Sequence, residues 1–209
     1  MATLPGIDGP RKPEGRGRPV DEREPELLAA VLAGDRAALD RLLRNHFDRI
    51  YALCRRLTGN DADGADAAQE ALIAITRGLA GGRFDGRSRF STWAYRVATN
   101  ACLDEMRRRS RRPQLVGDEI LAATAAPMAG VDRAVADRVD IDRALGGLPL
   151  DYRTAVVLRD LCQLDYGEIA EVLDIPTGTV RSRIARGRAA LADRLGNPGT
   201  FSDRPTPRS

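Results

Sequence analysis

The segment over residues 164–195 constrains the fold of this chain more than any other. Apolar residues recur at helical spacing on both sides of a short break, namely Ile169, Ala170, Leu173 and Ile175 before it and Val180, Ile184, Ala185 and Leu191 after it. Pro176 fits the start of the second helix, because its fixed φ and missing N–H are tolerated in the first helical turn. The segment therefore predicts two short amphipathic helices joined by a tight turn.

The second of these helices carries a basic face. Four arginines and several small hydroxyl residues share it, namely Thr177, Thr179, Arg181, Ser182, Arg183, Arg186 and Arg188. A helix with an apolar stripe and such a face can enter the major groove of DNA. The alternative is a solvated charged face on an ordinary bundle helix, and the spacing alone leaves both open.

Composition sets the fold class. Only 4% of the residues are aromatic, and alanine, leucine, arginine and aspartate dominate in place of the residues that sheets favour. We therefore expect an all-α protein. Lys12 is the single lysine among 33 basic residues; arginine suits bidentate phosphate and guanine contacts, but a GC-rich coding sequence gives the same bias. The functional argument therefore rests on where the arginines cluster.

Cysteine and histidine usage argues against a metal site or a disulfide framework. Cys54, Cys102 and Cys162 lie about fifty residues apart on apolar faces, which predicts reduced core thiols. His46 is the only histidine and has no cysteine or second histidine nearby, so we expect no metal and no cofactor. No run of about 18 apolar residues occurs, which predicts a cytoplasmic protein without membrane insertion of its own.

Composition shifts along the chain predict two helical domains. Residues 1–24 are rich in proline, glycine and charge, which predicts a disordered extension. Helical patterning then covers residues 25–112 and 138–196. Between them, residues 113–137 are predicted to be an acidic, flexible linker, and residues 197–209 a disordered tail.

Four carboxylates gather near the start of the helix expected from Asp63 to Leu79. They are Asp61, Asp63, Asp66 and Glu70. Asp66, Gln69 and Glu70 fall on one side of the helix at i, i+3 and i+4. A metal or acid–base site would need ligands from elsewhere, and no candidate stands out. The other hypothesis is a docking surface for a basic partner helix.

A loop with arginines and aromatic residues follows. The residues of interest are Arg83, Phe84, Arg87, Ser88, Arg89, Trp93, Tyr95, Arg96 and Asn100. Aromatic side chains interleaved with arginine suit stacking on exposed bases and holding a single strand. We expect Phe90 to be a core residue and Trp93 to take part in stacking.

A basic run ends the helix expected from about Thr92 to Arg112. It includes Arg107, Arg108 and Arg109, and Pro113 follows it. Cations complement the dipole at a helix C-terminus, yet this run exceeds what a helix end needs. We interpret it as a phosphate-binding face.

Three motifs together resemble a known family. They lie at residues 63–70 (DGADAAQE), 84–109 and 148–191, and the resemblance spans about 145 residues in the family's order. The family is the extracytoplasmic-function group of sigma factors, the dissociable subunits that bring bacterial RNA polymerase to promoters. The resemblance implies a region 2 bundle over residues 25–112 and a helix-turn-helix region 4 over residues 138–196.

The resemblance also implies roles for matching positions in the first domain. The face of Asp66, Gln69 and Glu70 would dock on the clamp helices of the largest polymerase subunit. The loop from Gly82 to Ser91, with Asn100 behind it, would take a flipped base of the −10 element. Strand opening would be supported by Trp93, Tyr95 and Arg96. The DNA phosphates would be bound by Arg107, Arg108 and Arg109.

In the second domain, the resemblance implies that Arg181, Ser182 and Arg186 read the −35 element. Arg183 and Arg188 would contact the DNA backbone or be partly structural, and the opposite face would touch the flap of the second-largest subunit. An anti-sigma factor is implied as a further partner. The chain departs from the family pattern at Asp85, Arg87, Ala74 and Ala185, which leaves the promoter sequence open.

Three functional hypotheses follow. The first is a promoter-specificity subunit that is not an enzyme and acts with core RNA polymerase on promoter DNA. The second is a stand-alone helix-turn-helix regulator that uses only the C-terminal helix pair. The third is a catalytic helical domain built on the carboxylates of residues 61–70.

Overall fold

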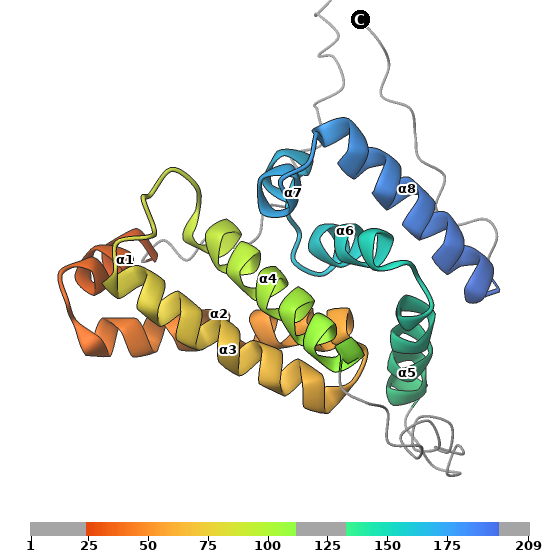
Figure 1. The fold of residues 1–209 in the computed structure, drawn as a ribbon, viewed down its shortest axis with the longest axis horizontal. Helices are drawn as coiled ribbons and strands as arrows, with labels where there is room; N and C mark the ends of the chain where they lie inside the picture. The colour runs from red at the N-terminus through yellow and green to blue at the C-terminus, as the bar shows by residue number, and fades with distance from the viewer. Residues whose placement is uncertain (1–23, 112–132, 197–209) are drawn as a thin grey trace, which may run out of the picture.

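A computed structural model describes residues 24–111 and 133–196. These residues form eight helices and no strand (Figure 1), which confirms the all-α prediction for the described part of the chain. The helices are α1 (Glu24–Leu32), α2 (Arg36–Thr58), α3 (Asp61–Ala80), α4 (Phe90–Arg111), α5 (Arg133–Gly146), α6 (Leu150–Asp160), α7 (Tyr166–Leu173) and α8 (Thr177–Arg194). The predictions for residues 1–23, 113–132 and 197–209 lie outside the described residues.

Local caps explain where the first helices begin and end. The Asp35 carboxylate accepts two backbone N–H bonds from the first turn of α2, at 2.8 and 3.1 Å. Gly59 ends α2 in the left-handed region with φ 84°. Asn60 then accepts the N–H of Asp63 at 2.8 Å, so α3 begins at Asp61, two residues earlier than the sequence pattern predicts.

Helices α1–α4 form the N-terminal unit, residues 24–111, in which α2, α3 and α4 pack against one another (Figure 1). Its core alternates large side chains from α2 with alanines from α3 and α4, which lets the helix axes approach closely. Cys54 and Cys102 are free and buried in this core. A hydrogen bond with Cys54, together with burial, raises the pKa of the Cys102 thiol. The Cys102 thiol therefore stays protonated, and both cysteines contribute to core packing.

Helices α5–α8 form the C-terminal unit, residues 133–196. Asp165 and Glu168 make a reciprocal capping box at the start of α7, with bonds of 2.8 and 2.9 Å between side chain and backbone. Asp174 ends α7 in the left-handed region with φ 52°, and α8 begins three residues later. The predicted pair of helices joined by a tight turn is thus confirmed.

Two details of that pair differ from the sequence prediction. Pro176 lies immediately before α8 with ψ 144°, outside its first turn. Ala185 is exposed, so its assignment as an apolar anchor is wrong. The anchors are instead Val180, Ile184 and Leu191, which are buried. Because these three side chains point to the core, Ala185, the residue after Ile184, lies on the solvent side of the helix.

A glycine fixes how closely α8 approaches α6. A Cβ on Gly187 would lie 2.6 Å from Val156 Cγ2 and 3.2 Å from the carbonyl oxygen of Tyr152. A larger side chain has no space there, because Val156 is a buried core residue and the other neighbour is a backbone carbonyl of α6. Contact between α6 and α8 therefore depends on this glycine.

The variant Gly187→Ala is expected to lower the free energy of unfolding by about 1–3 kcal/mol, as other overpacked cores do. Gly178→Ala is the matched control on the same helix, because nothing lies within 4 Å of its added Cβ. Alanine there should be neutral or stabilise by up to about 1 kcal/mol. Urea unfolding followed by circular dichroism measures both; equal stability of the two variants would contradict the close approach.

The two units lie against each other: α7 packs on α4, and α5 and α6 pack on α2 (Figure 1). Helix α5 begins at Arg133, so the last five residues of the predicted linker, 133–137, are helical instead of flexible. Within the described ranges, no helix is both long enough and apolar enough to cross a membrane.

Candidate functional site

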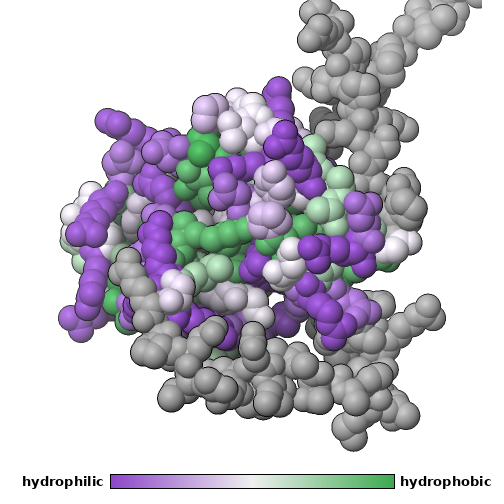
Figure 2. Space-filling model, turned by 45° about the vertical axis from the view of Figure 1, so that its right-hand side comes forward, coloured by the Kyte–Doolittle hydropathy of each residue, from purple (hydrophilic) through white to green (hydrophobic). Residues whose placement is uncertain are grey.

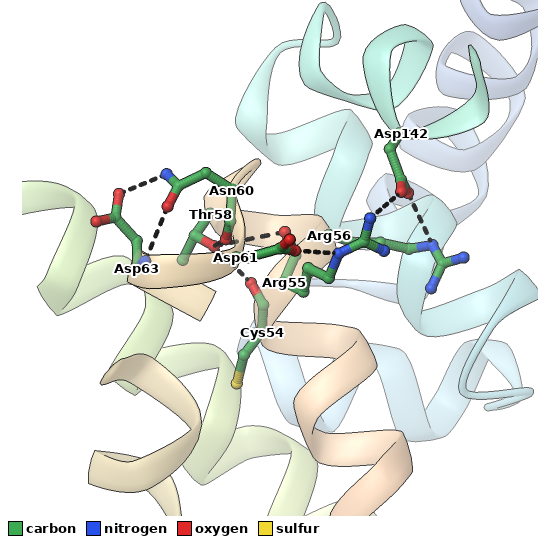
Figure 3. Close-up of polar contacts among 8 residues, drawn as sticks. All are labelled: Cys54, Arg55, Arg56, Thr58, Asn60, Asp61, Asp63 and Asp142. Atoms are coloured by element: carbon green, nitrogen blue, oxygen red, sulfur yellow. Dashed lines mark hydrogen bonds and ion pairs between the residues drawn. The ribbon is translucent and has the colours of Figure 1, made fainter. Parts of the chain in front are cut away.

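The first carboxylates of α3 are engaged by neighbouring side chains. Arg55 Nε donates to Asp61 at 2.6 Å (Figure 3), a contact that raises the pKa of Arg55. Asp63 accepts a bond from Asn60 Nδ2 at 2.7 Å and forms an ion pair with Arg109. These two carboxylates of the first turn of α3 therefore pair with arginine, and Asp63 also bonds to the capping residue Asn60. They do not converge on a catalytic centre with the rest of the segment.

The other acidic residues of α3 face solvent. Asp66, Gln69 and Glu70 are all exposed on one side of the helix. In residues 24–111 and 133–196, neither Asp66 nor Glu70 forms an ion pair or a hydrogen bond through its carboxylate. The structure thus brings these three predicted residues together on an open face with two uncompensated negative charges.

The aromatic residues around the start of α4 form a packed cluster. Phe84 meets Trp93 edge-on at 5.4 Å between ring centroids and meets Phe90 in the same way at 6.0 Å. Trp93 is only 6% exposed and Tyr95 is fully buried. The core role of Phe90 is confirmed. The expectation that Trp93 stacks on exposed bases is wrong for this conformation, because its ring is used in the core.

Glycine makes room for the tryptophan. A Cβ on Gly78 of α3 would lie 2.8 Å from the Trp93 ring atoms Cζ2 and Cη2. The ring therefore sits directly on the backbone of α3. Tyr95, which is fully buried, can act on DNA only through the residues that it positions.

Several of the residues predicted to bind the −10 element line one cavity. It measures about 390 Å³ and lies between α3 and α4, within the size range of small-ligand pockets. The predicted residues that line it are Glu70, Arg83, Trp93, Arg96, Asn100 and Arg108. Ala74 also lines it, and its small side chain leaves the cavity open. Three guanidinium groups and two carboxylates, those of Glu70 and Asp104, surround its apolar part. The arginines suit the phosphates of a ring-bearing ligand.

The rest of the loop faces a different cavity. Phe84, Ser88 and Arg89 line a space of about 550 Å³ shared with α1 and α2. His46 lines the same space and makes a 3.3 Å contact with Glu24 through Nε2. The structure therefore divides the predicted −10 residues between two sides of the loop. Arg87 lies on the exposed surface beside Asp85.

The basic run at the end of α4 is exposed but paired. Arg107 donates to Asp104 at 3.1 Å, and Arg108 lies 3.2 Å from the Glu105 carboxylate. Arg109 is the arginine that pairs with Asp63. More than half of each of the three side chains is exposed. A phosphate could replace the exposed Asp104 carboxylate beside Arg107 at little cost, whereas Glu105 is buried and Asp63 largely so.

On α8, the predicted sequence-reading residues share one exposed face. Arg181, Ser182 and Arg186 are exposed, with Ala185 between them. The Arg181 guanidinium lies 5.6 Å from the centre of the Tyr166 ring of α7, which directs it away from the core. Thr177 is exposed and Thr179 half-buried near the N-terminus of the helix.

The other two arginines of α8 are held by the C-terminal unit itself. Arg183 donates to Asp151 at 2.6 Å. Arg188 makes two bonds to Asp160, at 2.5 and 3.2 Å. Only about a quarter of each of these arginine side chains is exposed. This geometry fits a structural role that fixes α8 on α6.

Three residues that are prominent in the structure could not be identified from local sequence patterns. Arg153 is buried between the two units, and Glu168 touches α4 from α7. His46 is 95% buried, and its Nδ1 has no hydrogen-bond partner among the residues that the structure describes. Their neighbours come from distant parts of the chain, so local spacing could not reveal them.

Comparisons with known proteins agree with this geometry. Residues 42–112 match the family model "Sigma-70 region 2", and residues 138–191 match "Sigma-70, region 4". The chain is 36% identical over 182 residues to the ECF RNA polymerase sigma factor SigM of Mycobacterium tuberculosis, covering 87% of this chain and 89% of that protein. It is also 36% identical to the sigma factor SigW of Bacillus subtilis, covering 80% of this chain and 94% of that one.

A solved structure has the same architecture. CnrH, in complex with the cytosolic domain of CnrY, superposes with a TM-score of 0.61 at 25% identity, covering 82% of this chain and 96% of CnrH. The match extends over both helical units. Together with the two region models and the relatives above 30% identity, it leads to one assignment. This chain belongs to the extracytoplasmic-function group of the sigma-70 family of RNA polymerase sigma factors.

Proposed function

We propose that this chain binds core RNA polymerase and directs it to promoters by reading a −35 element as duplex and a −10 element as an opened strand. The observation that carries the proposal is the presence of three separate exposed features on one chain. They are the acidic face of α3, the arginine-lined cavity between α3 and α4, and the exposed face of α8. The proposed role needs no catalytic residue of its own.

The acidic face is proposed to dock on the clamp helices of the largest polymerase subunit. Asp66 and Glu70 support this because their charges are exposed and uncompensated. Exposed, unpaired carboxylates attract a basic partner during association and determine how its surface aligns with α3.

The cavity between α3 and α4 is proposed to take the flipped base of the −10 element. Asn100 lines it and can donate and accept hydrogen bonds with a base edge. Arg83 and Arg96 lie beside it for the strand's phosphates. Flipping a base into such a pocket costs a few kcal/mol of stacking energy, which these contacts would offset.

The exposed face of α8 is proposed to read the −35 element in the major groove. An arginine guanidinium can donate hydrogen bonds to both major-groove acceptors of a guanine, O6 and N7. A serine hydroxyl can donate to or accept from the edge of any base. Arg181 and Arg186 are both exposed, and Ser182 lies between them on the same face of α8.

A hollow in the C-terminal unit is proposed to contact the polymerase flap. It measures about 230 Å³ and is lined mainly by apolar residues of α5, α6 and α8, including Ile141, Leu161 and Leu195. Figure 2, which brings the α5 and α8 side forward, shows hydrophobic side chains bordered by hydrophilic ones. An anti-sigma factor is a further proposed partner, supported by the similarity to the sigma factor RpoE of Bartonella quintana, solved in complex with the anti-sigma factor NepR.

The test is run-off transcription with core RNA polymerase of the source bacterium on genomic DNA fragments. The chain should produce discrete start sites that core polymerase alone does not. Failure to bind core polymerase, combined with tight operator binding by the free chain, would favour a stand-alone regulator. The family comparisons do not favour that alternative.

A further inference from the structure

The four arginines over residues 181–188 of α8 are held in two different ways. Arg183 and Arg188 pair with carboxylates of α6. Arg181 and Arg186 lie on the exposed face proposed to read the −35 element, and each of them contacts a tyrosine. Within residues 24–111 and 133–196, neither of these two arginines forms an ion pair with a carboxylate. The arginines available to DNA are therefore the ones that a tyrosine holds.

Tyr166, the first residue of α7, lies beside Arg181. The guanidinium carbon of Arg181 is 5.6 Å from the centre of the half-buried tyrosine ring, a distance at which the ring attracts a cation. The capping box of Asp165 and Glu168 fixes the start of α7 and hence the place of this ring. Arg159 of α6 lies 5.0 Å from the same ring centre and bonds to a backbone carbonyl of the loop before α7 at 2.7 Å. The C-terminal unit thus holds the ring in place without DNA.

Tyr152 of α6 contacts Arg186 through its hydroxyl. Arg186 Nη1 donates to this hydroxyl at 3.4 Å. The next residue, Gly187, is the point at which α8 approaches α6, and a Cβ on it would lie 3.3 Å from Tyr152 Cβ. This close approach brings the tyrosine alongside α8. The bond is longer than the usual range of about 2.7–3.2 Å, so we expect it to contribute less than the ring beside Arg181.

A tyrosine holds an arginine without cancelling its charge. A carboxylate engages the N–H groups of a guanidinium, and DNA must displace it before these groups can bond to a base. An aromatic ring attracts the cation through its face and leaves the N–H donors available, and a tyrosine hydroxyl uses one of the five. Arg181 and Arg186 therefore keep their charge and most of their donors for DNA, while part of their rotational freedom is removed.

Reduced rotational freedom favours the reading of sequence. An arginine side chain loses rotamer entropy when it is fixed in the two-bond geometry that a guanine edge requires. A side chain that is already held near that geometry loses less. Phosphate contacts supply most of the affinity for DNA whatever the sequence, whereas contacts to base edges supply the discrimination. Holding these two arginines should therefore change discrimination between base pairs more than overall affinity.

From these contacts we infer that Tyr166 and Tyr152 are positioning residues, which orient Arg181 and Arg186 toward the base edges of the −35 element. The inference rests on the proposed function of α8. The two tyrosines act through different groups, the ring of Tyr166 and the hydroxyl of Tyr152. Loss of the ring at the first position and loss of the hydroxyl at the second should therefore each lower discrimination at one base pair.

The first experiment compares two variants of Tyr166. Tyr166→Leu removes the aromatic ring, whereas Tyr166→Phe keeps it and is the matched control. The holoenzyme is assayed on promoters with single −35 substitutions. We expect Tyr166→Leu to lower discrimination at the base pair that depends on Arg181 by about two- to fivefold, and Tyr166→Phe to retain it. In an Arg181→Ala background, Tyr166→Leu should cause no further loss. Wild-type discrimination by Tyr166→Leu, or an equal loss in both variants, would overturn the inference.

Tyr152 should give the opposite result with phenylalanine. Its hydroxyl is the group that Arg186 contacts, so Tyr152→Phe should lower discrimination at the base pair that depends on Arg186 by up to about twofold. Discrimination at the base pair that depends on Arg181 should stay unchanged. An equal loss at both base pairs would mean that α8 as a whole has moved, which contradicts a positioning role for Tyr152.

The last experiment uses the free full chain and needs no polymerase. Protons near the face of an aromatic ring resonate upfield in nuclear magnetic resonance spectra. We expect upfield side-chain resonances for Arg181 in the wild type, in Tyr166→Phe and in Tyr152→Phe, and their loss in Tyr166→Leu. Ordinary resonances for Arg181 in the wild type would overturn its contact with Tyr166. A wild-type holoenzyme that reads no −35 sequence defeats the proposed function instead, while these spectra still decide whether the tyrosine holds the arginine.

Discussion

A chain in which Asp66 and Glu70 are both replaced by arginine is expected to lose at least about a hundredfold in affinity for core RNA polymerase. The reason is electrostatic. Both carboxylates are exposed and uncompensated within the described residues, and the proposed partner surface is basic. Placing like charges against each other across an interface costs several kcal/mol. Fluorescence titration of the labelled chain with core polymerase measures the loss.

Asp61 provides the control for this prediction. It lies on the same helix, but its carboxylate is already bonded to Arg55. Asp61→Asn should therefore change the affinity by no more than about twofold, as expected for an exposed pair. Circular dichroism should show that all variants remain helical. Wild-type affinity of the doubly reversed chain would show that α3 does not face the polymerase.

The second large effect is expected at Arg181. Arg181→Ala should weaken promoter recognition by about 1–3 kcal/mol, or about 5- to 150-fold, and relax specificity at one position of the −35 element. The Arg181 side chain is exposed, with its guanidinium 5.6 Å from the centre of the Tyr166 ring, so a base edge can reach it. Competition between promoters with single −35 substitutions, assayed with the holoenzyme, measures both effects.

Arg188→Ala is the matched comparison on α8. Its guanidinium is held by two bonds to Asp160, so the change should lower stability by less than about 1 kcal/mol and leave sequence preference unaltered. Equal loss of specificity at Arg181 and Arg188 would mean that α8 presents a different face to DNA.

Periodicity and turn chemistry were enough to predict most helices of the described part. Gly59 stops α2 as expected, and the helix pair of residues 164–195 folds as its spacing indicates. Errors of about two residues occur where a side-chain cap decides the border, as at Asn60. Local sequence does not reveal which of several polar residues becomes the N-cap of the helix.

The candidate site was predicted less completely, for physical reasons that the residues illustrate. Trp93 was placed at the DNA surface, but its ring packs on Gly78, because a large apolar ring gains more from burial than from an exposed loop. The ion pairs of Arg109 and Arg188 join residues far apart in the chain. The same holds for Arg153, whose bond to Leu57 spans the two units. Such contacts depend on tertiary packing, which spacing in one sequence does not encode.

The most direct test is DNase I footprinting, combined with permanganate probing of unpaired thymines, on a promoter that the chain activates. With core polymerase and the chain together, we predict protection of the upstream duplex at the −35 element and reactive, unpaired thymines near the −10 element. Neither should occur with the chain alone. The same upstream footprint from the free chain, with no opened thymines when core polymerase is added, would contradict the account.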